Sequence, residues 1–384
     1  MPHLMLRSDQ VLGPSRGQKP RFSPISAERA GASPCISEWG HDFLPSYRRL
    51  GMLRRKLTAP VMALTATATA RVRQDIEDVL SLDRPLRVVG SFDRPNLRWY
   101  VEQVDGHSAK MAAIREMVRS EVGAAVVYAG TRRTVETIRS SLARLGISTA
   151  SYHTGLEPEL RSRVQKDFLG GKIRIVVATN EFGMGVDKSD VRLVPHYQMP
   201  GTLESYYQEA GRAGRDGEAA RCVALWGKDD QRLHRSFLDR SRPAVRGLKR
   251  VARTLRNAVG SGERGRVEVG GLLRATGCSE EELWAALTAL ERLGVVRVYS
   301  PTEEASTDDF VEHSSLDLGL HASAPDWSRA HRLRRAGIEA LRAVRGYATA
   351  PRCRRQVLLR YFGDETPMCG GCDLCDAAGL GRVR

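Results

Sequence analysis

Four cysteines near the C-terminus have the spacing of metal ligands. They are Cys353, Cys369, Cys372 and Cys375. Four thiolates can bind a tetrahedral Zn²⁺ ion, and the Gly370-Gly371 pair lets the chain turn around the metal. Four protein ligands leave no open coordination position, so the spacing predicts a structural zinc site. A pair of disulfides is the alternative, and it is disfavoured in a reducing cytosol.

Two arginines three residues apart form a second candidate site. They lie in Gln208-Glu-Ala-Gly-Arg212-Ala-Gly-Arg215, where we expect a helix to end. Guanidinium groups make bidentate contacts to phosphate oxygens, and the glycines allow a ligand to approach closely. Arg215 is therefore a candidate arginine finger. For these residues alone, a solvated basic helix end is an equal alternative.

A glycine-containing loop upstream favours the phosphate interpretation. Ala178–Lys188 directly follows an expected strand and contains Gly183, Gly185 and Asp187. The carboxyl edge of a parallel sheet is where α/β folds bind ligands. An ordinary strand-to-helix loop rarely needs two glycines so close together, so the segment predicts a ligand-binding edge.

The apolar pattern predicts the elements that position these residues. Short β-rich runs alternate with amphipathic helices, which indicates a parallel sheet with helices on both faces. We expect a RecA-like α/β lobe over residues 96–228. Its expected strands are 124–128, a run that reaches 152, 173–178, 191–196 and 221–225. Its expected helices begin at Thr131, Pro158 and Thr202, and the last of them continues to Ala213.

The regions on either side of this lobe have different residue patterns. Residues 1–34 have no periodicity and are predicted to be disordered or foreign to the fold. Residues 240–320 are mainly helical, and Ser279 with Glu282 forms a capping box before a short helix and a strand at 295–299. This order predicts a winged-helix-like region, with a random helical hairpin as the alternative. We expect a polar loop at 300–324. A basic helix then opens a zinc-binding module at 326–378.

Charge indicates the kind of partner. The chain of 384 residues has 60 Lys and Arg against 45 Asp and Glu, a formal charge of +15. A surplus of this size favours a polyanion, with nucleic acid as the first candidate. No apolar run approaches the ~18 residues that cross a bilayer. The first 30 residues lack the apolar core of a signal peptide, so we expect a cytoplasmic protein without a membrane partner.

Taken in order, these motifs resemble those of the RecQ family of ATP-dependent DNA helicases in superfamily 2. Leu64–Thr69 is similar to motif III, Ser91–Asn96 to the linker into the second lobe, Ala125–Thr131 to motif IV, Ala178–Lys188 to motif V and Gln208–Arg215 to motif VI. Cys35–Tyr47 resembles the family's aromatic-rich loop. The zinc segment also matches, with Cys353-Arg-Arg and Tyr361-Phe-Gly ahead of the three later cysteines.

The resemblance implies a 3′-to-5′ DNA helicase of recombination and repair, in which hydrolysis of ATP with Mg²⁺ moves two RecA-like lobes along one strand. The implied roles fall on five groups of residues. Catalysis is implied for Arg215, Arg212, Gln208 and Asp187, and nucleotide binding for Gly183 and Gly185 with both arginines. Coupling of the lobes is implied for Thr65 and Thr67. DNA contact is implied for Trp39, His41, Phe43 and Arg132, and zinc binding for the four cysteines.

The chain departs from the family in the order of its domains, because the winged-helix candidate precedes the zinc module and in many members follows it, and in its nucleotide-binding motifs. It has neither a phosphate loop ending in Gly-Lys-Ser/Thr nor an Asp-Glu-Ala-His motif, and Ala32–Cys35 stands where the latter is expected. We therefore expect most of the first lobe to be missing, with residues 35–95 as its remnant. The expected partners are ATP and single-stranded, forked or junction DNA at the nucleoid. The alternative is a non-catalytic DNA-binding module. An RNA helicase of the same superfamily is disfavoured by the zinc segment.

Overall fold

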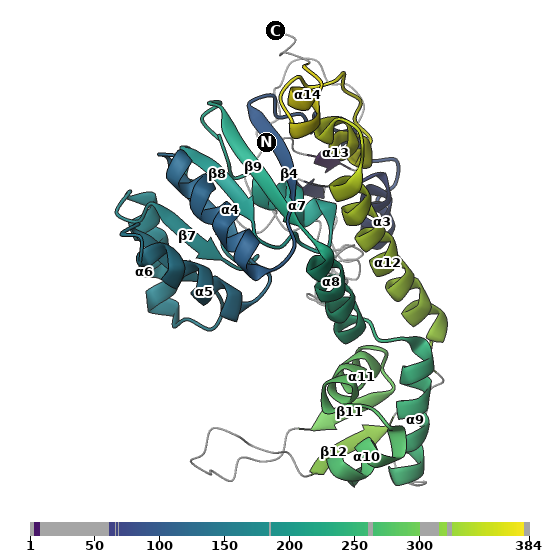
Figure 1. The fold of residues 1–384 in the computed structure, drawn as a ribbon. Coiled ribbons are helices and arrows are strands. Elements are labelled where there is room, and N and C mark those ends of the chain that lie inside the picture. Colours follow the sequence, from purple (N-terminus) through teal and green to yellow (C-terminus); the bar gives the residue numbers. More distant parts are fainter. Residues whose placement is uncertain are drawn as a thin grey trace. The chain divides into compact units, whose positions relative to one another are not determined.

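The computed structural model describes residues 4–7, 61–65, 67, 69–183, 186–259, 264–299, 315–320 and 325–379 (Figure 1). The chain divides into two compact units. One comprises Met1–Gly227 together with Val344–Arg384, and the other comprises Lys228–Ala343. The division falls inside the long helix that leads to the cysteines, so part of that helix belongs to each unit.

A six-stranded parallel sheet forms the centre of the first unit (Figure 1). Its spatial order is β4-β9-β8-β5-β7-β6. The strands are β4 (Leu97–Gln103), β5 (Ala124–Tyr128), β6 (Thr149–Tyr152), β7 (Ile175–Ala178), β8 (Val191–His196) and β9 (Ala220–Trp226). All five neighbouring pairs are parallel, which confirms the predicted architecture. Edge strand β4 is an addition that the apolar pattern does not predict.

Helices cover both faces of this sheet. They are α4 (His107–Ser120), α5 (Arg132–Ala143), α6 (Pro158–Leu169) and α7 (Leu203–Ala210). On one face, Ile114 of α4 and Ile138 of α5 pack with Val127 of β5. Because strand residues alternate between faces, Tyr128 lies on the other side, where it stacks on His196, whose ring in turn contacts Tyr206 of α7.

The N-terminal part of this unit contributes a small antiparallel sheet. Strand β1 (Leu4–Arg7) lies between β2 (Met62–Thr65) and β3 (Leu86–Val88). Helix α3 (Ala70–Leu80) buries Ile76 in a core with Ala63. The prediction of no regular structure in residues 1–34 is wrong for β1, because pairing with two strands far along the chain supplies order that no local periodicity encodes. The rest of that segment lies outside the described residues.

The second unit is a helical region around a three-stranded antiparallel sheet of order β10-β12-β11. Its elements are α8 (Lys228–Ser241), α9 (Val245–Val259), β10 (Arg264–Glu268), α10 (Val269–Thr276), α11 (Glu280–Arg292), β11 (Val296–Tyr299) and β12 (Ser315–Leu320). The predicted capping box begins α11, with both reciprocal hydrogen bonds present. The order from α9 to β12 fits the winged-helix-like prediction.

The predicted polar loop at 300–324 is wrong for Ser315–Leu320. This segment forms β12, the central strand of the sheet, and its Leu316 and Leu318 are buried. Ser315 and Asp317 alternate with these leucines, so the polar–apolar alternation of a strand is present, but it extends over only a few residues. Pairing with strands on both sides stabilises it.

Three helices complete the described chain: α12 (Trp327–Thr349), α13 (Arg354–Phe362) and α14 (Asp373–Ala377). Among the described helices, none is long and apolar enough to cross a membrane.

Candidate functional site

The arginines of motif VI lie against the glycine loop that follows β7. Arg212 donates from Nη1 to the carbonyl oxygen of Gly183 at 2.5 Å. Gly183 has φ +123°, and a Cβ built there would lie 1.9 Å from Cζ of Arg212. Only glycine fits this position, because a side chain would meet the guanidinium and the backbone is in a region that L-residues avoid. Gly183 and Arg212, which are each predicted to bind the nucleotide, are therefore in contact.

Arg215 contacts residues further along the same loop. Its Nη1 donates to the carbonyl oxygen of Val186 at 3.0 Å and to Oδ1 of Asp187 at 2.5 Å. The Arg215 side chain is 16% exposed, whereas that of Asp187 is 85% exposed. The carboxylate therefore orients a largely buried arginine from the solvent side. Gly185 lies outside the described residues.

Both arginines retain a donor atom that could hold an anion. The Nε atoms of Arg212 and Arg215 are buried and have no hydrogen-bond partner among the described residues. Buried polar groups are usually satisfied, so an orphaned guanidinium donor requires an explanation. Phosphate oxygens are the acceptors that this group binds best. The residues present therefore fit the nucleotide phosphates that the motifs imply.

Gln208 connects this helix to the segment of motif III. Its Nε2 donates to Oγ1 of Thr67, which is 1% exposed. The backbone N–H of Thr67 in turn donates to Oγ1 of Thr65 at 3.4 Å. The two threonines predicted to couple the lobes are thus buried and joined to the motif VI helix.

The linker Ser91–Asn96 holds the turn that carries both arginines, a role that sequence reasoning missed. Arg94 donates to the carbonyl oxygens of Gly211 at 3.2 Å, Ala213 at 3.0 Å and Gly214 at 2.9 Å. Asn96 donates to Gly214 at 2.7 Å. These bonds satisfy carbonyls of the turn that follows α7. This turn also explains why the helix predicted to reach Ala213 ends at Ala210.

A buried polar pair lies behind the same helix. Nε2 of His196 and Oε2 of Glu209 are 2.9 Å apart, and their side chains are 0% and 7% exposed. Nδ1 of His196 has no partner among the described residues. The neighbouring Tyr128 hydroxyl donates to the Phe182 carbonyl oxygen at 3.0 Å, and burial raises the pKa of Tyr128 far above its ordinary value. The sequence offers no signal for this pair beyond its two residue types.

The predicted DNA contacts are only partly described. Arg132, at the start of α5, is exposed and donates from Nη2 to Oγ1 of Thr154 at 2.6 Å. Trp39, His41 and Phe43 lie outside the described residues. Their role in stacking on bases therefore stays a prediction.

The four C-terminal cysteines form the predicted cluster. Their Sγ atoms all lie within 4.8 Å of one another. Sγ of Cys369 is 3.9 Å from that of Cys375, and Sγ of Cys372 is 4.0 Å from that of Cys353. Zn–S bonds of about 2.3 Å in a tetrahedron place the sulfurs about 3.8 Å apart. The geometry fits a closed zinc site, and these four residues would hold the ion.

The cysteine segment is joined to the α/β lobe by specific bonds. Asp364 accepts from Oγ of Ser91 at 2.7 Å and from the backbone N–H of Phe92 at 2.9 Å. The ring of Phe92 stacks on Phe362 with centroids 4.8 Å apart. The Tyr361 hydroxyl donates to Oε1 of Glu204 on α7 at 2.7 Å. The linker that holds the motif VI turn is therefore also held by the zinc segment.

A second set of hydrogen bonds lies within the cysteine segment itself. Arg354 is 5% exposed, and its guanidinium donates to both carboxylate oxygens of Asp373 at 2.9 to 3.0 Å. It also donates to the Tyr347 carbonyl oxygen at 2.8 Å. One arginine thus joins the end of α12 to the helix that carries Cys375.

Two family models match the chain. Residues 109–217 match the helicase conserved C-terminal domain, and residues 308–376 match the RecQ zinc-binding family. These ranges contain the motif V and VI residues and the four cysteines, respectively.

Several curated proteins are similar to the chain. ATP-dependent DNA helicase RecQ of Haemophilus influenzae is 41% identical over 225 residues, which cover 58% of this chain and 36% of the relative. Probable ATP-dependent DNA helicase RecS of Bacillus subtilis is 36% identical over 66% of this chain and 51% of the relative. RecQ of the same organism is 42% identical over 54% of this chain and 35% of the relative.

The chain thus spans 36%, 51% and 35% of the length of these three relatives. The similarity covers the lobe with motifs V and VI, and the zinc-binding match covers the thiol cluster. Both models match one chain over the residues that form its two sites, and together with the RecQ relatives they support its assignment to the RecQ family of helicases.

Proposed function

We propose that this chain provides the second RecA-like lobe and zinc module of a RecQ-type, ATP-dependent 3′-to-5′ DNA helicase that acts in recombination and repair. The observation that carries the proposal is the pair Arg212 and Arg215. Both are held by the loop after β7, and both keep a buried guanidinium donor without a partner among the described residues.

In this proposal the chain's own residues stabilise charge at the nucleotide. Arg215, oriented by Asp187, acts as the arginine finger and Arg212 binds a neighbouring phosphate oxygen. Positioned cations of this kind lower the barrier to phosphoryl transfer by stabilising the charge of the transition state. ATP with Mg²⁺ supplies the transferable phosphoryl group when bound. Gln208 and Thr67 then link the nucleotide side of the lobe to motif III.

The proposed polynucleotide partner is DNA, in single-stranded, forked or junction form. The net charge of +15 supports a polyanionic partner. A protein with this activity would act at the nucleoid, in the cytoplasm. Zinc would serve a structural role, since four thiolates close its coordination sphere.

The phosphate loop must come from elsewhere for hydrolysis to occur. The 384 residues contain no Gly-Lys-Ser/Thr segment. We therefore expect this polypeptide to bind ATP weakly and to show no turnover above background, because the β- and γ-phosphates lack their backbone cradle.

The first test measures DNA binding and DNA-stimulated ATPase activity of this polypeptide. We expect it to shift labelled single-stranded and forked DNA in a gel without hydrolysing ATP. Failure to bind either DNA at low salt would contradict the proposal. Turnover that Arg215→Ala abolishes would instead show that the chain supplies a phosphate-binding element of another kind.

The arginines can be tested without turnover by titration with a fluorescent ATP analogue. The variant Arg212→Ala/Arg215→Ala removes two charge-assisted contacts, so we expect the affinity to fall at least about tenfold. The control Arg133→Ala/Arg163→Ala removes the same charge from exposed positions on α5 and α6. Equal loss in both variants would show that net charge alone attracts the nucleotide.

A further inference from the structure

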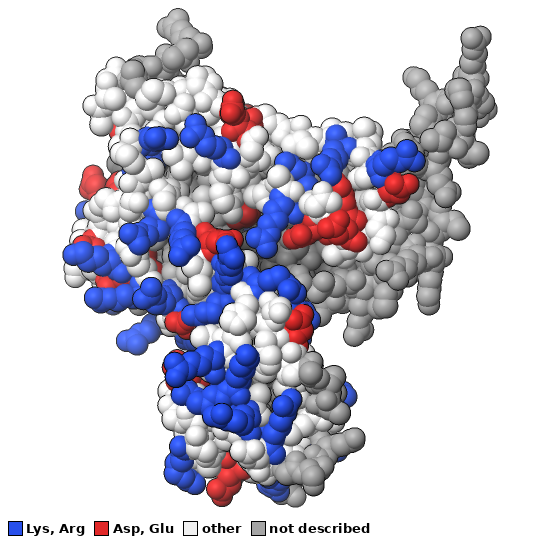
Figure 2. Space-filling view, turned by 90° about the vertical axis from the view of Figure 1, so that its right-hand side faces the viewer, with Lys and Arg blue, Asp and Glu red and all other residues white. Residues whose placement is uncertain are grey.

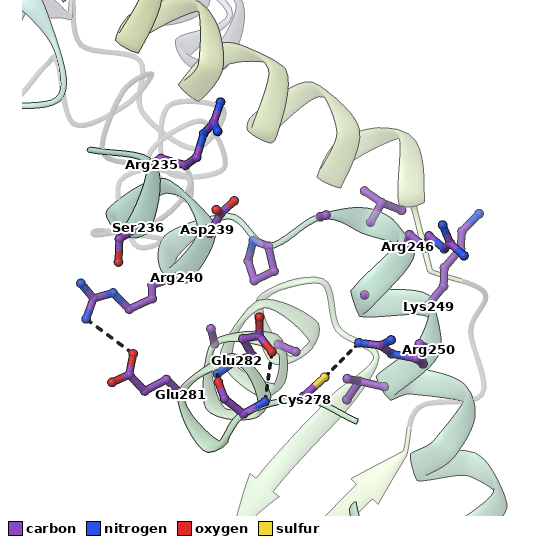
Figure 3. Close-up of a pocket in the computed structure, with 18 of the residues that line it drawn as sticks. Arg235, Ser236, Asp239, Arg240, Arg246, Lys249, Arg250, Cys278, Glu281 and Glu282 are labelled. Atoms are coloured by element: carbon purple, nitrogen blue, oxygen red, sulfur yellow. Dashed lines mark hydrogen bonds and ion pairs between the residues drawn. The ribbon is translucent and has the colours of Figure 1, made fainter. Parts of the chain in front are cut away.

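A large hollow opens in the unit Lys228–Ala343, away from the residues assigned above. It has a volume of about 1410 Å³ and lies between α8, α9 and the beginning of α11 (Figure 3). Seven of its lining residues are Lys or Arg, and three are Asp or Glu. Figure 2 shows basic side chains gathered over this unit, with few acidic ones between them. The hollow is therefore a positively charged feature of the described surface.

The three acidic residues of the lining are already engaged. Asp239 accepts from Arg334 at 2.6 Å, and Glu281 pairs with Arg240 at 4.0 Å, as Figure 3 shows for the latter. Glu282 is bound in the capping box, where it accepts from the backbone N–H of Ser279 at 3.0 Å. None of them neutralises the remaining cations of the hollow.

Helix α9 places four of these cations along one side. The residues are Arg246, Lys249, Arg250 and Arg253, and each lies three or four positions from two of the others, so neighbours on the helix surface carry like charge. Such pairs repel one another. Lys249 contacts the Trp327 ring and Arg250 donates to Sγ of Cys278 at 3.2 Å, but within the described chain no carboxylate pairs with any of the four. The arrangement lowers the stability of the helix unless a bound anion offsets it.

Helix α8 also contributes residues to the lining of the hollow. Arg235 is exposed, has no carboxylate partner among the described residues, and projects from α8 in Figure 3. No Phe, Tyr or Trp lines the hollow. Proteins that hold single strands stack bases on aromatic rings, whereas duplex DNA is held mainly through the phosphates of its two backbones. The cation row of α9, together with Arg235 of α8 and no aromatic residue in the lining, fits the second case.

We infer that the hollow between α8 and α9 binds the phosphate backbone of duplex DNA. This inference rests on the proposed function, since it supplies a duplex contact for the same helicase. It assigns the contact to Arg235, Arg246 and Arg253, which lie on α8 and α9, rather than to α11 or the sheet of the winged-helix-like region.

The test compares two triple variants of the full chain. Arg235→Ala/Arg246→Ala/Arg253→Ala removes three cations from the hollow. Arg256→Ala/Arg297→Ala/Arg335→Ala removes the same charge from exposed positions of this unit that do not line it. Binding of a labelled blunt 20-base-pair duplex and of a single strand of equal length is measured by anisotropy over a range of salt. The melting temperature of each variant verifies that it is folded.

The loss of three phosphate contacts should reduce the slope of log K against log salt by about 2.7. At 0.15 M salt the same relation predicts a fall in duplex affinity on the order of 100-fold. The control variant should lose less than about threefold, since its side chains lie away from the bound DNA. Single-strand binding should change less than duplex binding in the hollow variant.

The outcomes separate this inference from the proposed function. Wild-type protein that binds neither DNA form overturns both. Wild-type protein that binds single strands, with unchanged duplex affinity in the hollow variant, overturns only the inference. Equal losses on duplex and single strand overturn the duplex assignment, and equal losses in the two triple variants show that no localised contact exists.

Discussion

At Gly183 the backbone approaches Arg212 so closely that only a hydrogen atom fits. A Cβ at this position would lie 1.9 Å from Cζ of Arg212, and φ is +123°. Gly217 offers a matched comparison, because its φ is +88° but nothing lies within 4 Å of the position of its Cβ. The two glycines share an unusual backbone conformation and differ in the steric contact.

We expect Gly183→Ala to destabilise the first unit clearly more than Gly217→Ala. Backbone strain at a positive φ costs about 1 to 3 kcal/mol in either variant, and only the first must also displace a guanidinium. Urea unfolding followed by far-UV circular dichroism gives the difference in free energy of unfolding. Binding of the fluorescent ATP analogue should weaken in Gly183→Ala alone. Indistinguishable variants would mean that Arg212 moves aside without cost.

At the scale of elements, α7 is held from several sides. Arg94 and Asn96 fasten the turn at its C-terminus, Glu209 pairs with His196 beneath it, and Glu204 accepts from Tyr361 of α13. All of these contacts except the Glu209–His196 pair join residues far apart in the chain. The position of the motif VI arginines therefore depends on the linker and on the zinc segment as well as on the helix itself.

Glu204 makes this arrangement sensitive to pH. Burial raises the pKa of Glu204 above its ordinary value, and the hydrogen bond from Tyr361 only partly opposes this. A raised pKa in the folded state means that the contribution of this group to stability is complete below about pH 4.3, its unfolded value, and is lost as pH rises through the folded pKa.

Glu204→Gln removes this dependence and retains an acceptor for Tyr361. We expect the variant to melt at least as high as the wild type at pH 7, and the relative advantage of the wild type to grow as the pH falls towards 4. Calorimetry at several pH values measures the two curves, with Glu159→Gln on exposed α6 as the control. A variant that loses stability mainly at pH 7 would show that the charged carboxylate is the favoured form.

At the scale of the whole molecule, the zinc cluster and the candidate nucleotide site share one structural support. Asp364 binds the linker at Ser91 and Phe92, and the same linker binds the motif VI turn through Arg94. Metal binding to four thiolates stabilises a small module strongly, because the apo segment has little core of its own. Loss of zinc should therefore loosen the structure of the linker Ser91–Asn96.

We expect the chain to bind one zinc ion. Removal of this ion by a strong chelator should increase the rate of hydrogen exchange at the Phe92 amide, which donates to Asp364. The Tyr197 amide, which donates to the Tyr128 carbonyl oxygen within the sheet, is the internal control and should exchange as before. Cys372→Ser should lose the metal, whereas Cys278→Ser should keep it. Unchanged exchange at Phe92 after chelation would mean that the linker does not depend on the module.

Some helices and strands could be predicted from the sequence and others could not, for physical reasons. Strand β5 and the cap of α11 were predictable because a buried strand and a capping box are encoded by adjacent residues. Strand β12 was missed because six residues with only two buried leucines show too little alternation, and its stability comes from neighbours on both sides. Edge strand β4 was missed although its alternating burial is regular.

For the sites, residue types and spacing predicted the cysteine cluster, and together with the family resemblance they predicted the two arginines of motif VI and the glycine of the loop that faces them. These signals are local, since a metal or a phosphate demands particular groups at particular intervals. Only the tertiary structure decided that Arg94 holds the arginine-bearing turn, that Asp364 holds the linker, and that cations of α8 and α9 surround one hollow. Contacts across more than a hundred residues, or between two helix faces, depend on the packing of the folded chain, and no short pattern records them.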